Sequence, residues 1–271
     1  MNIATITAIT GAAALALYVT STSMLYRNVG KNHNAERKTG ERSAVWLIAL
    51  AAVVLHGATL FTSTFRPGGL NLAFFNSLSV TAWCTVAITL LWNTSRPVIN
   101  LGLVLFPLTA VVLLVAMLFG HRQQAVNPGL QWHILTSVVA FSLLTMAAAQ
   151  AALVRLQNRR LHNHRPGGFL QNLPPLTVME TVLFQILCAS FVMLSLSLLT
   201  GFFFLDDLFA QRQVHKTTLA IIAWLIIAVL LAGHFLRGWR GQKASSLTIG
   251  AFVSLLLAYF GSKLVIELIL G

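Results

Sequence analysis

Three histidines lie inside long apolar stretches of the sequence, where an ionisable side chain is costly and therefore points to a function. His56 occurs in VVLHGATLF, His133 in LQWHILTS and His234 in LLAGHFLRGWRG. A neutral imidazole among apolar residues is a good ligand for haem iron, and ligation by two histidines is a common low-spin arrangement. The alternative for each histidine is structural, namely a hydrogen bond to a nearby backbone carbonyl or a position among lipid head groups.

The composition places these histidines in a membrane protein. Of the 271 residues, 57% are hydrophobic and only 9% are Asp, Glu, Lys or Arg, whereas a soluble domain carries roughly 25% charged residues. So much apolar surface excludes both a soluble protein and a disordered one. The formal net charge of +12 comes from Lys and Arg in short gaps between apolar runs. That distribution indicates contact with anionic lipid head groups and argues against nucleic-acid binding.

The apolar residues form eight runs, each long enough to cross a bilayer. A hydrocarbon core of roughly 30 Å needs about 20 helical residues. The runs cover residues 2–25, 44–63, 72–94, 97–119, 129–154, 176–203, 217–236 and 246–270. Their unbroken apolarity favours helices over barrel strands, which are shorter and alternate. The sequence therefore predicts an all-α, polytopic integral membrane protein, with about eight transmembrane helices forming a single domain over residues 1–271.

Basic residues are distributed unevenly between the two sides of this bundle. Most Lys and Arg fall in the first, third, fifth and seventh loops, and cytoplasmic loops carry the excess of basic residues. We therefore expect the odd-numbered loops in the cytoplasm and both termini on the outer side. No Lys or Arg precedes Arg27, so the first run is interpreted as a retained helix and not as a cleaved signal peptide.

The depths of the three histidines decide which of them can share a site. His56 lies in the outer half of the second run and His133 near the outer end of the fifth, so at about 1.5 Å per residue they lie at similar depth. His234 lies near the cytoplasmic end of the seventh run, roughly 20 Å away along the membrane normal. We expect His56 and His133 to bind one haem iron, with His234 at a second position. His121 and His215 fall in outer loops, where they line a vestibule or are simply solvated.

Other kinds of site lack the residues that they need. No Cys, Asp or Glu completes a zinc site with the histidines, and no Ser-His-Asp, Walker or HExxH pattern occurs. A proton-coupled transporter would require more acids at mid-membrane depth than the sequence offers. Cys84 and Cys188 lie in separate apolar runs and are expected to be free thiols. We therefore favour a binding protein over an enzyme.

Five stretches of the sequence form a family pattern. They are VVLHGATLF, NLAFFNSLSVTAWCTVAITLLW, QWHILTSVVAF, PPLTVMETVLFQ and, most specifically, HKTTLAIIAWLIIAVLLAGHFLRGWRGQKASSLTIGAFVSLLLAYFG. The pattern resembles the cytochrome c assembly protein family in its CcsA/HemX-like branch. The resemblance implies a haem-handling protein of the bacterial inner membrane, with haem b as the cofactor. It also implies that His133 is the first external-side haem histidine, that His234 ends the helix after the haem-binding loop, and that His56 is the histidine of the second span.

Two stretches depart from the family pattern. LDDLFAQRQVHK lacks the tryptophans of the family's outer loop, and SKLVIELILG, after YFG, lacks a second external histidine. Both departures argue against full cytochrome c synthetase activity. The sequence thus predicts a protein of haem trafficking or cytochrome c assembly that contacts the lipid bilayer and haem. The alternative is a non-catalytic accessory protein that has kept the fold, has lost haem and acts on another membrane protein.

Overall fold

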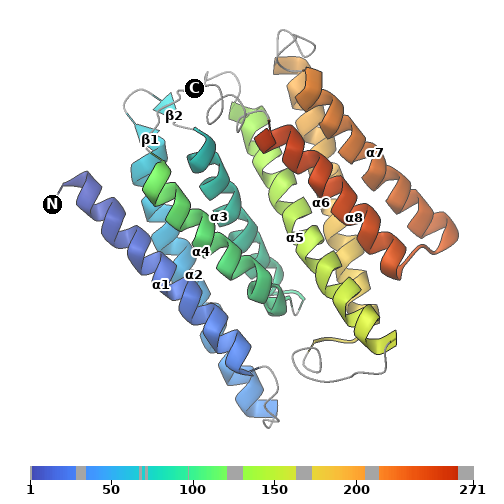
Figure 1. The fold of residues 1–271 in the computed structure, drawn as a ribbon, viewed down its shortest axis with the longest axis horizontal. Helices are drawn as coiled ribbons and strands as arrows, with labels where there is room; N and C mark the ends of the chain where they lie inside the picture. Colours follow the sequence, from blue (N-terminus) through green and yellow to red (C-terminus); the bar gives the residue numbers. More distant parts are fainter. Residues whose placement is uncertain are drawn as a thin grey trace. The chain divides into compact units, whose positions relative to one another are not determined.

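The chain is almost entirely helical in the computed structural model, which describes residues 2–28, 35–66, 69–70, 73–96, 98–120, 131–162, 173–204 and 214–261. The helices are α1 (Ile3–Asn28), α2 (Ala35–Thr64), α3 (Phe74–Trp92), α4 (Gly102–Phe119), α5 (Gln131–His162), α6 (Leu176–Phe204), α7 (Val214–Arg237) and α8 (Gly241–Leu256), as Figure 1 shows. A 3-10 turn, η1 (Ile99–Leu101), precedes α4, and a π-helical turn, η4 (Leu257–Gly261), follows α8. Two short strands, β1 (Phe65–Arg66) and β2 (Gly69–Leu70), pair antiparallel.

The eight predicted spans are confirmed as helices within the described residues. Each is long and apolar enough to cross a membrane, with mean hydropathy between 1.5 and 2.7. The all-α membrane fold predicted from the sequence is therefore correct. The side of the membrane on which the termini lie stays a prediction from the distribution of basic residues.

Several helices extend beyond the apolar runs that predicted them. Helix α2 begins at Ala35 and includes the charged stretch AERKTGERS, and α5 continues through RLQNRRLH to His162. Apolar runs mark only what lies in the bilayer, whereas Glu, Lys, Arg and Gln are good helix formers in water. Helix α8 begins at Gly241, before the expected start of the last run, and the described part of that run ends at Gly261.

The described helices fall into two compact units. In unit 1, α1 packs against α2 and α4, and α3 packs against the same two helices. In unit 2, α5 packs against α6 and α8, and α7 packs against the same two helices. Each unit is thus a closed set of four helices in which every helix has two neighbours. The prediction of one transmembrane domain over residues 1–271 stays a prediction.

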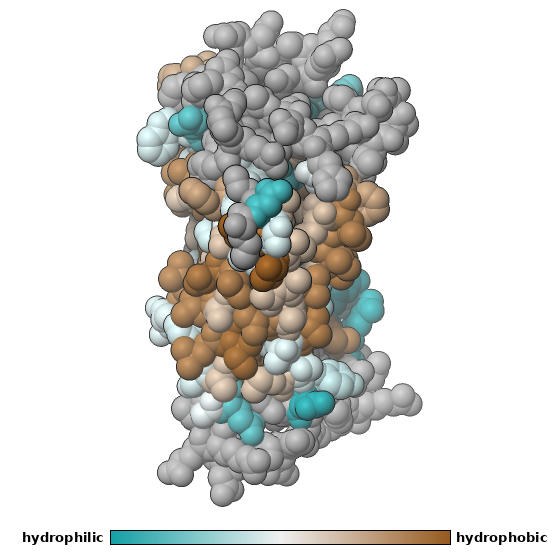
Figure 2. Space-filling view, turned by 90° about the vertical axis from the view of Figure 1, so that its left-hand side faces the viewer, coloured by the Kyte–Doolittle hydropathy of each residue, from teal (hydrophilic) through white to brown (hydrophobic). Residues whose placement is uncertain are grey.

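Apolar side chains face outward over unit 1. Figure 2 shows them as a broad belt on the face that lies to the left in Figure 1. Ile9, Val54 and Phe61 expose 54%, 65% and 65% of their surface. An all-round apolar surface is typical of helices in contact with lipid.

Polar side chains connect the helices within each unit. In unit 1, Thr59 donates a hydrogen bond to Thr10, and the Trp83 indole N–H donates to the Val53 carbonyl. In unit 2, the hydroxyls of Ser137 and Ser197 are 2.7 Å apart. Interhelical hydrogen bonds of this kind stabilise helix association in lipid, where burial of apolar surface contributes little.

Candidate functional site: two histidines with an available ring nitrogen

His56 lies in the interior of unit 1, and both of its ring nitrogens have partners. The residue has no exposed surface. Its Nε2 is 3.0 Å from Ser79 Oγ in α3, and its Nδ1 is 3.4 Å from the Tyr18 hydroxyl in α1. A neutral imidazole has one donor and one acceptor nitrogen, so the two hydroxyls satisfy it completely. His56 therefore connects α1, α2 and α3, and its role as an iron ligand, which would require one of these bonds to break, stays a prediction.

Replacing His56 by Leu is expected to destabilise unit 1. The substitution removes both hydrogen bonds and leaves two buried hydroxyls without them, so the free energy of unfolding should fall by about 1–3 kcal/mol. Tyr18→Phe removes only the longer bond and should cost about 0.6 kcal/mol. Thermal unfolding in detergent measures both. A His56→Leu protein as stable as the wild type would show that these bonds do not hold the three helices.

His133 has a different arrangement, at the start of α5 in unit 2. Its Nδ1 is 3.0 Å from the backbone carbonyl oxygen of Ser197 in α6, with the Thr200 hydroxyl at 3.5 Å. Because a carbonyl only accepts hydrogen bonds, Nδ1 carries a proton, and the neutral ring keeps its lone pair on Nε2. Among the described residues, Nε2 has no hydrogen-bond partner. His133 thus has one ring nitrogen available to a ligand.

His234, near the end of α7, has the same arrangement. Its Nδ1 is 3.0 Å from the backbone carbonyl oxygen of Trp239, and Nε2 has no partner within the part of the chain that the structure describes. The ring stacks on Phe184, with centroids 3.5 Å apart and planes at 15°. Metal-binding histidines usually donate their other N–H to a carbonyl or carboxylate, which fixes the tautomer and the ring orientation. His133 and His234 therefore share one arrangement, with Nδ1 on a backbone carbonyl and Nε2 without a partner among the described residues.

The two histidines of unit 2 mark separate positions along α6. His133 contacts Ser197, whereas His234 stacks on Phe184. These two α6 residues are about 20 Å apart at 1.5 Å per residue. One metal ion cannot bind both histidines, because a metal–imidazole bond is only about 2 Å long, as it is for zinc. The iron shared by His56 and His133 stays a prediction, with His56 in unit 1 and His133 in unit 2.

The corner between α7 and α8 holds the His234 ring in place. Gly238 and Gly241 adopt φ values of 67° and 61°, which other residues rarely adopt. The Trp239 N–H donates to the Gly233 carbonyl at 3.1 Å, so the chain folds back on the end of α7. The Trp239 indole packs directly on Gly233, where a Cβ would overlap it. The GWRG pattern therefore supplies the two positive-φ glycines of this corner and the tryptophan that packs on Gly233.

Replacing Gly233 by Ala is expected to destabilise unit 2 by about 1–3 kcal/mol, because the new methyl group displaces Trp239, whose carbonyl orients His234. Gly250→Ala is the matched control. Gly250 also lies in a helix, but a Cβ there meets nothing within 4 Å, so the control should be neutral or gain up to about 1 kcal/mol from helix propensity. Thermal unfolding of the two variants in detergent measures the difference. Equal stability would contradict the close packing of Trp239 on Gly233.

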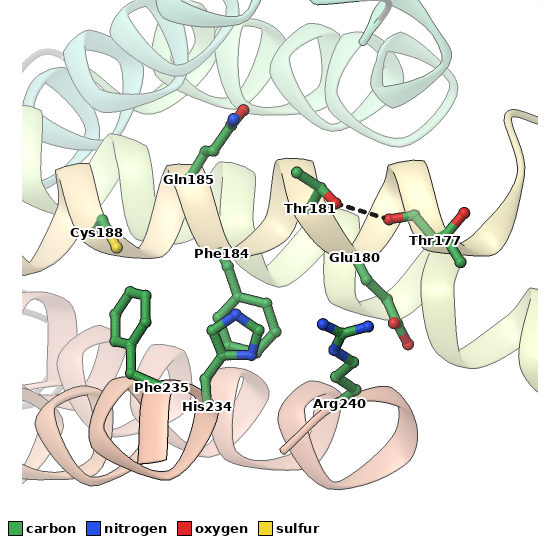
Figure 3. A pocket seen from close by; sticks show the side chains of 9 residues that line it. All are labelled: Thr177, Glu180, Thr181, Phe184, Gln185, Cys188, His234, Phe235 and Arg240. Carbon is green, nitrogen blue, oxygen red and sulfur yellow. Dashed lines mark hydrogen bonds between the residues drawn. The ribbon is translucent and has the colours of Figure 1, made fainter. Parts of the chain in front are cut away.

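A pocket of about 420 Å³ lies beside His234, between α6 and α7 (Figure 3). Its volume is within the range of small-molecule sites. The lining residues are Thr177, Glu180, Thr181, Phe184, Gln185, Cys188, His234, Phe235 and Arg240. The pocket therefore combines an imidazole, apolar rings and a pair of opposite charges.

Most polar lining residues lie toward one end of this pocket, and Gln185 lies toward the other, near Cys188 and Phe184. Glu180 Oε1 accepts the Gly241 N–H at 2.9 Å, which places the carboxylate at the N-terminus of α8, where the helix dipole favours a negative charge. The Thr181 hydroxyl donates to the Thr177 carbonyl at 2.9 Å. Phe184, Cys188 and Phe235 lie toward the other end in Figure 3. The pocket is thus polar at one end and largely apolar at the other.

Sequence reasoning found His234 but missed Glu180 and Arg240 as pocket residues. The available signal was their occurrence as charged residues in two of the family stretches, PPLTVMETVLFQ and GWRG. Of the two histidines predicted in outer loops, His215 is an exposed residue in the first turn of α7, and His121 lies outside the described residues. Cys84 and Cys188 are free thiols, as predicted.

The comparisons with known proteins agree on one family. The model of the Cytochrome C assembly protein family matches residues 44–270. The inner membrane protein YpjD of Escherichia coli K12 is 32% identical over 245 residues, which are 86% of this chain and 90% of YpjD. An uncharacterized 28.8 kDa protein of Azospirillum brasilense is 34% identical over 86% of this chain and 77% of its own length.

A more distant relative is the cytochrome c biogenesis protein CcsA of Chlamydomonas reinhardtii. It is 24% identical over 213 residues, which are 71% of this chain and 58% of that protein. No solved structure matches the chain.

Proposed function

The chain belongs to the cytochrome c assembly protein family, and from this membership we propose that it binds haem b as cargo and passes it on within the inner membrane. Family membership supports a haem-related role in cytochrome c biogenesis. The eight apolar helices and the likeness to an inner membrane protein make it a multi-pass protein of that membrane. The binding of haem b and the residues that bind it are the proposal.

The residues around His234 fit a haem group. The hydrogen bond from Nδ1 to the Trp239 carbonyl leaves the Nε2 lone pair for iron, and this bond is the single observation that carries the proposal. The adjoining pocket has a largely apolar end for the ring, and at the other end it has Arg240 beside the Glu180 carboxylate, which accepts the Gly241 N–H. When bound, haem would supply the iron centre, and the chain would supply the oriented imidazole of His234 and an apolar surface.

His133 shares the hydrogen-bond arrangement of His234. Its Nδ1–H is likewise held by a backbone carbonyl, and it lies near the other end of α6. Two separate positions on one helix suit a protein that accepts haem at one and releases it from the other. We propose that His133 and His234 each bind one haem, which differs from the pair of His56 and His133 predicted from the sequence.

We also propose that the protein lacks full synthetase activity. The stretch LDDLFAQRQVHK contains no tryptophan, whereas the family motif that presents haem to the apocytochrome is rich in tryptophan. In cells without their own synthetase, this chain should not restore covalent cytochrome c. Restoration of haem-stained cytochrome c would overturn this part of the proposal.

A titration of the purified apoprotein with haemin in mild detergent tests haem binding. We expect saturation at two equivalents, with a sharpened Soret band that empty micelles do not produce. Metal-free protoporphyrin gives no axial ligation and serves as the spectral control. Haemin that partitions into protein-containing and empty micelles equally would contradict the proposal and favour an accessory role through another membrane protein.

A further inference from the structure

The His234 pocket contains a positively charged side chain, that of Arg240, which has no part in binding iron. Arg240 lines the pocket together with His234, and it comes from the corner between α7 and α8 (Figure 3). It is the N-cap residue of α8, in extended conformation, between Trp239 and the positive-φ Gly241. The corner therefore fixes the backbone of Arg240 at the edge of the pocket, which its exposed side chain lines.

The guanidinium is available to a ligand. Within the described residues, no carboxylate forms an ion pair with Arg240. The neighbouring carboxylate, that of Glu180, accepts the Gly241 N–H instead. That bond ties the start of α8 to α6 directly beside Arg240.

With one oxygen of the Glu180 carboxylate tied to the Gly241 N–H, the arrangement of the pocket leaves Arg240 to meet a ligand with one acidic edge. Along α6 the lining changes from Thr177, Glu180 and Thr181 to Phe184, Gln185 and Cys188, over about 16 Å at 1.5 Å per residue, so the second end is less polar but carries one amide. Arg240 lies at the polar end in Figure 3, and Phe235 lies at the apolar end, beside Cys188. His234 stands between them, stacked on Phe184. A porphyrin has the same polarity, because its two propionates lie on one edge and the opposite edge is hydrocarbon.

We propose that Arg240 binds a propionate carboxylate of the porphyrin whose iron faces His234, and so sets the orientation of the ring in the pocket. This inference rests on the proposed function. A guanidinium offers two parallel N–H donors that match the two oxygens of a carboxylate. Glu180 acts on this step only as a positioning residue, through its bond to the Gly241 N–H.

The test compares two iron-free ligands, so that its result does not depend on His234. Protoporphyrin IX carries two free carboxylates, and its dimethyl ester carries none. Their binding to the intact protein in detergent is followed by porphyrin fluorescence, with empty micelles as the blank. We expect the wild type to bind the free acid at least about tenfold more tightly than the ester, since a hydrogen bond to a charged group is strong in such a site.

Variants at Arg240 then assign the preference. Arg240→Gln should remove the preference for protoporphyrin IX over its dimethyl ester, because it weakens the binding of the acid and not of the ester. Arg240→Lys, which keeps the charge but loses the two-pronged geometry, should keep part of it. Arg237→Gln is the matched control, because Arg237 is an exposed arginine of the same corner that does not line the pocket. Thermal unfolding of each variant identifies any loss of fold.

The outcomes separate this inference from the proposed function. An unchanged preference in Arg240→Gln, or an equal loss of acid and ester binding, overturns the role of Arg240 while haemin binding through His234 stands. A wild type that binds neither porphyrin nor haemin overturns both. A preference lost only in Arg240→Gln and partly kept in Arg240→Lys supports the proposal.

Discussion

The variant His234→Ala is expected to bind one haem equivalent where the wild type binds two, with affinity at the lost position weakened by about 100-fold or more. Loss of a residue that merely orients a metal ligand already costs about 10- to 100-fold in affinity, and loss of the ligand itself costs more. The stacked Phe184 ring would remain, so the pocket should persist with an open ligand position. Haemin titration of the apoprotein, with the bound haem quantified as its pyridine adduct, measures the effect.

Two further measurements distinguish a ligand from a structural residue. Added imidazole should enter the vacant position in His234→Ala and restore the Soret band of the wild type, which no repair of folding would do. His215→Ala, which removes an exposed histidine of the same helix, should bind both equivalents. Full haemin binding by His234→Ala would show that His234 is a structural residue of the corner between α7 and α8.

The second large effect is expected at His133. His133→Ala should remove the other haem equivalent and leave the His234 position unchanged, because the α6 residues that contact the two histidines are about 20 Å apart. Substitutions at such a distance are additive, so the double variant should bind no haem above the level of empty micelles. The same titration measures all three proteins.

The His133 result also decides the role of His56. Because both ring nitrogens of His56 are paired with hydroxyls, we expect His56→Leu to keep both haem equivalents despite its lower stability. Loss of all haem in either His133→Ala or His234→Ala would contradict two independent positions. Loss of the same equivalent in His56→Leu and His133→Ala would instead support the shared iron predicted from the sequence.

The fold could be predicted from the sequence because the thickness of the bilayer sets the length of a helix that crosses it. Eight apolar runs near 20 residues can form little else than eight helices, and the structure has them. The ends of the helices were harder to predict. The stretch AERKTGERS in α2 is hydrophilic and gives no apolar signal, and α8 begins at Gly241 because the Glu180 carboxylate, distant in sequence, accepts its N–H.

The candidate site shows the limit of sequence reasoning more clearly. The family stretch around GWRG singled out His234, and depth placed it apart from His56, but neither showed which histidines keep a ring nitrogen without a partner. The difference is in the partners of the ring nitrogens: hydroxyls on both for His56, and one backbone carbonyl for His133 and His234. Those partners come from other helices or from a turn with two positive-φ glycines, and no periodicity reveals them. Arg240 and Glu180 were missed for the same reason.

The most direct test of the haem-handling account is the absorption spectrum of the wild-type protein purified in mild detergent from haem-replete cells. The account predicts a Soret band that persists through purification, corresponds to bound haem b, and is reduced in both His133→Ala and His234→Ala. A well-folded, colourless preparation that also fails to take up haemin would contradict it. The chain would then be an accessory protein of the family that acts by contact with another membrane protein.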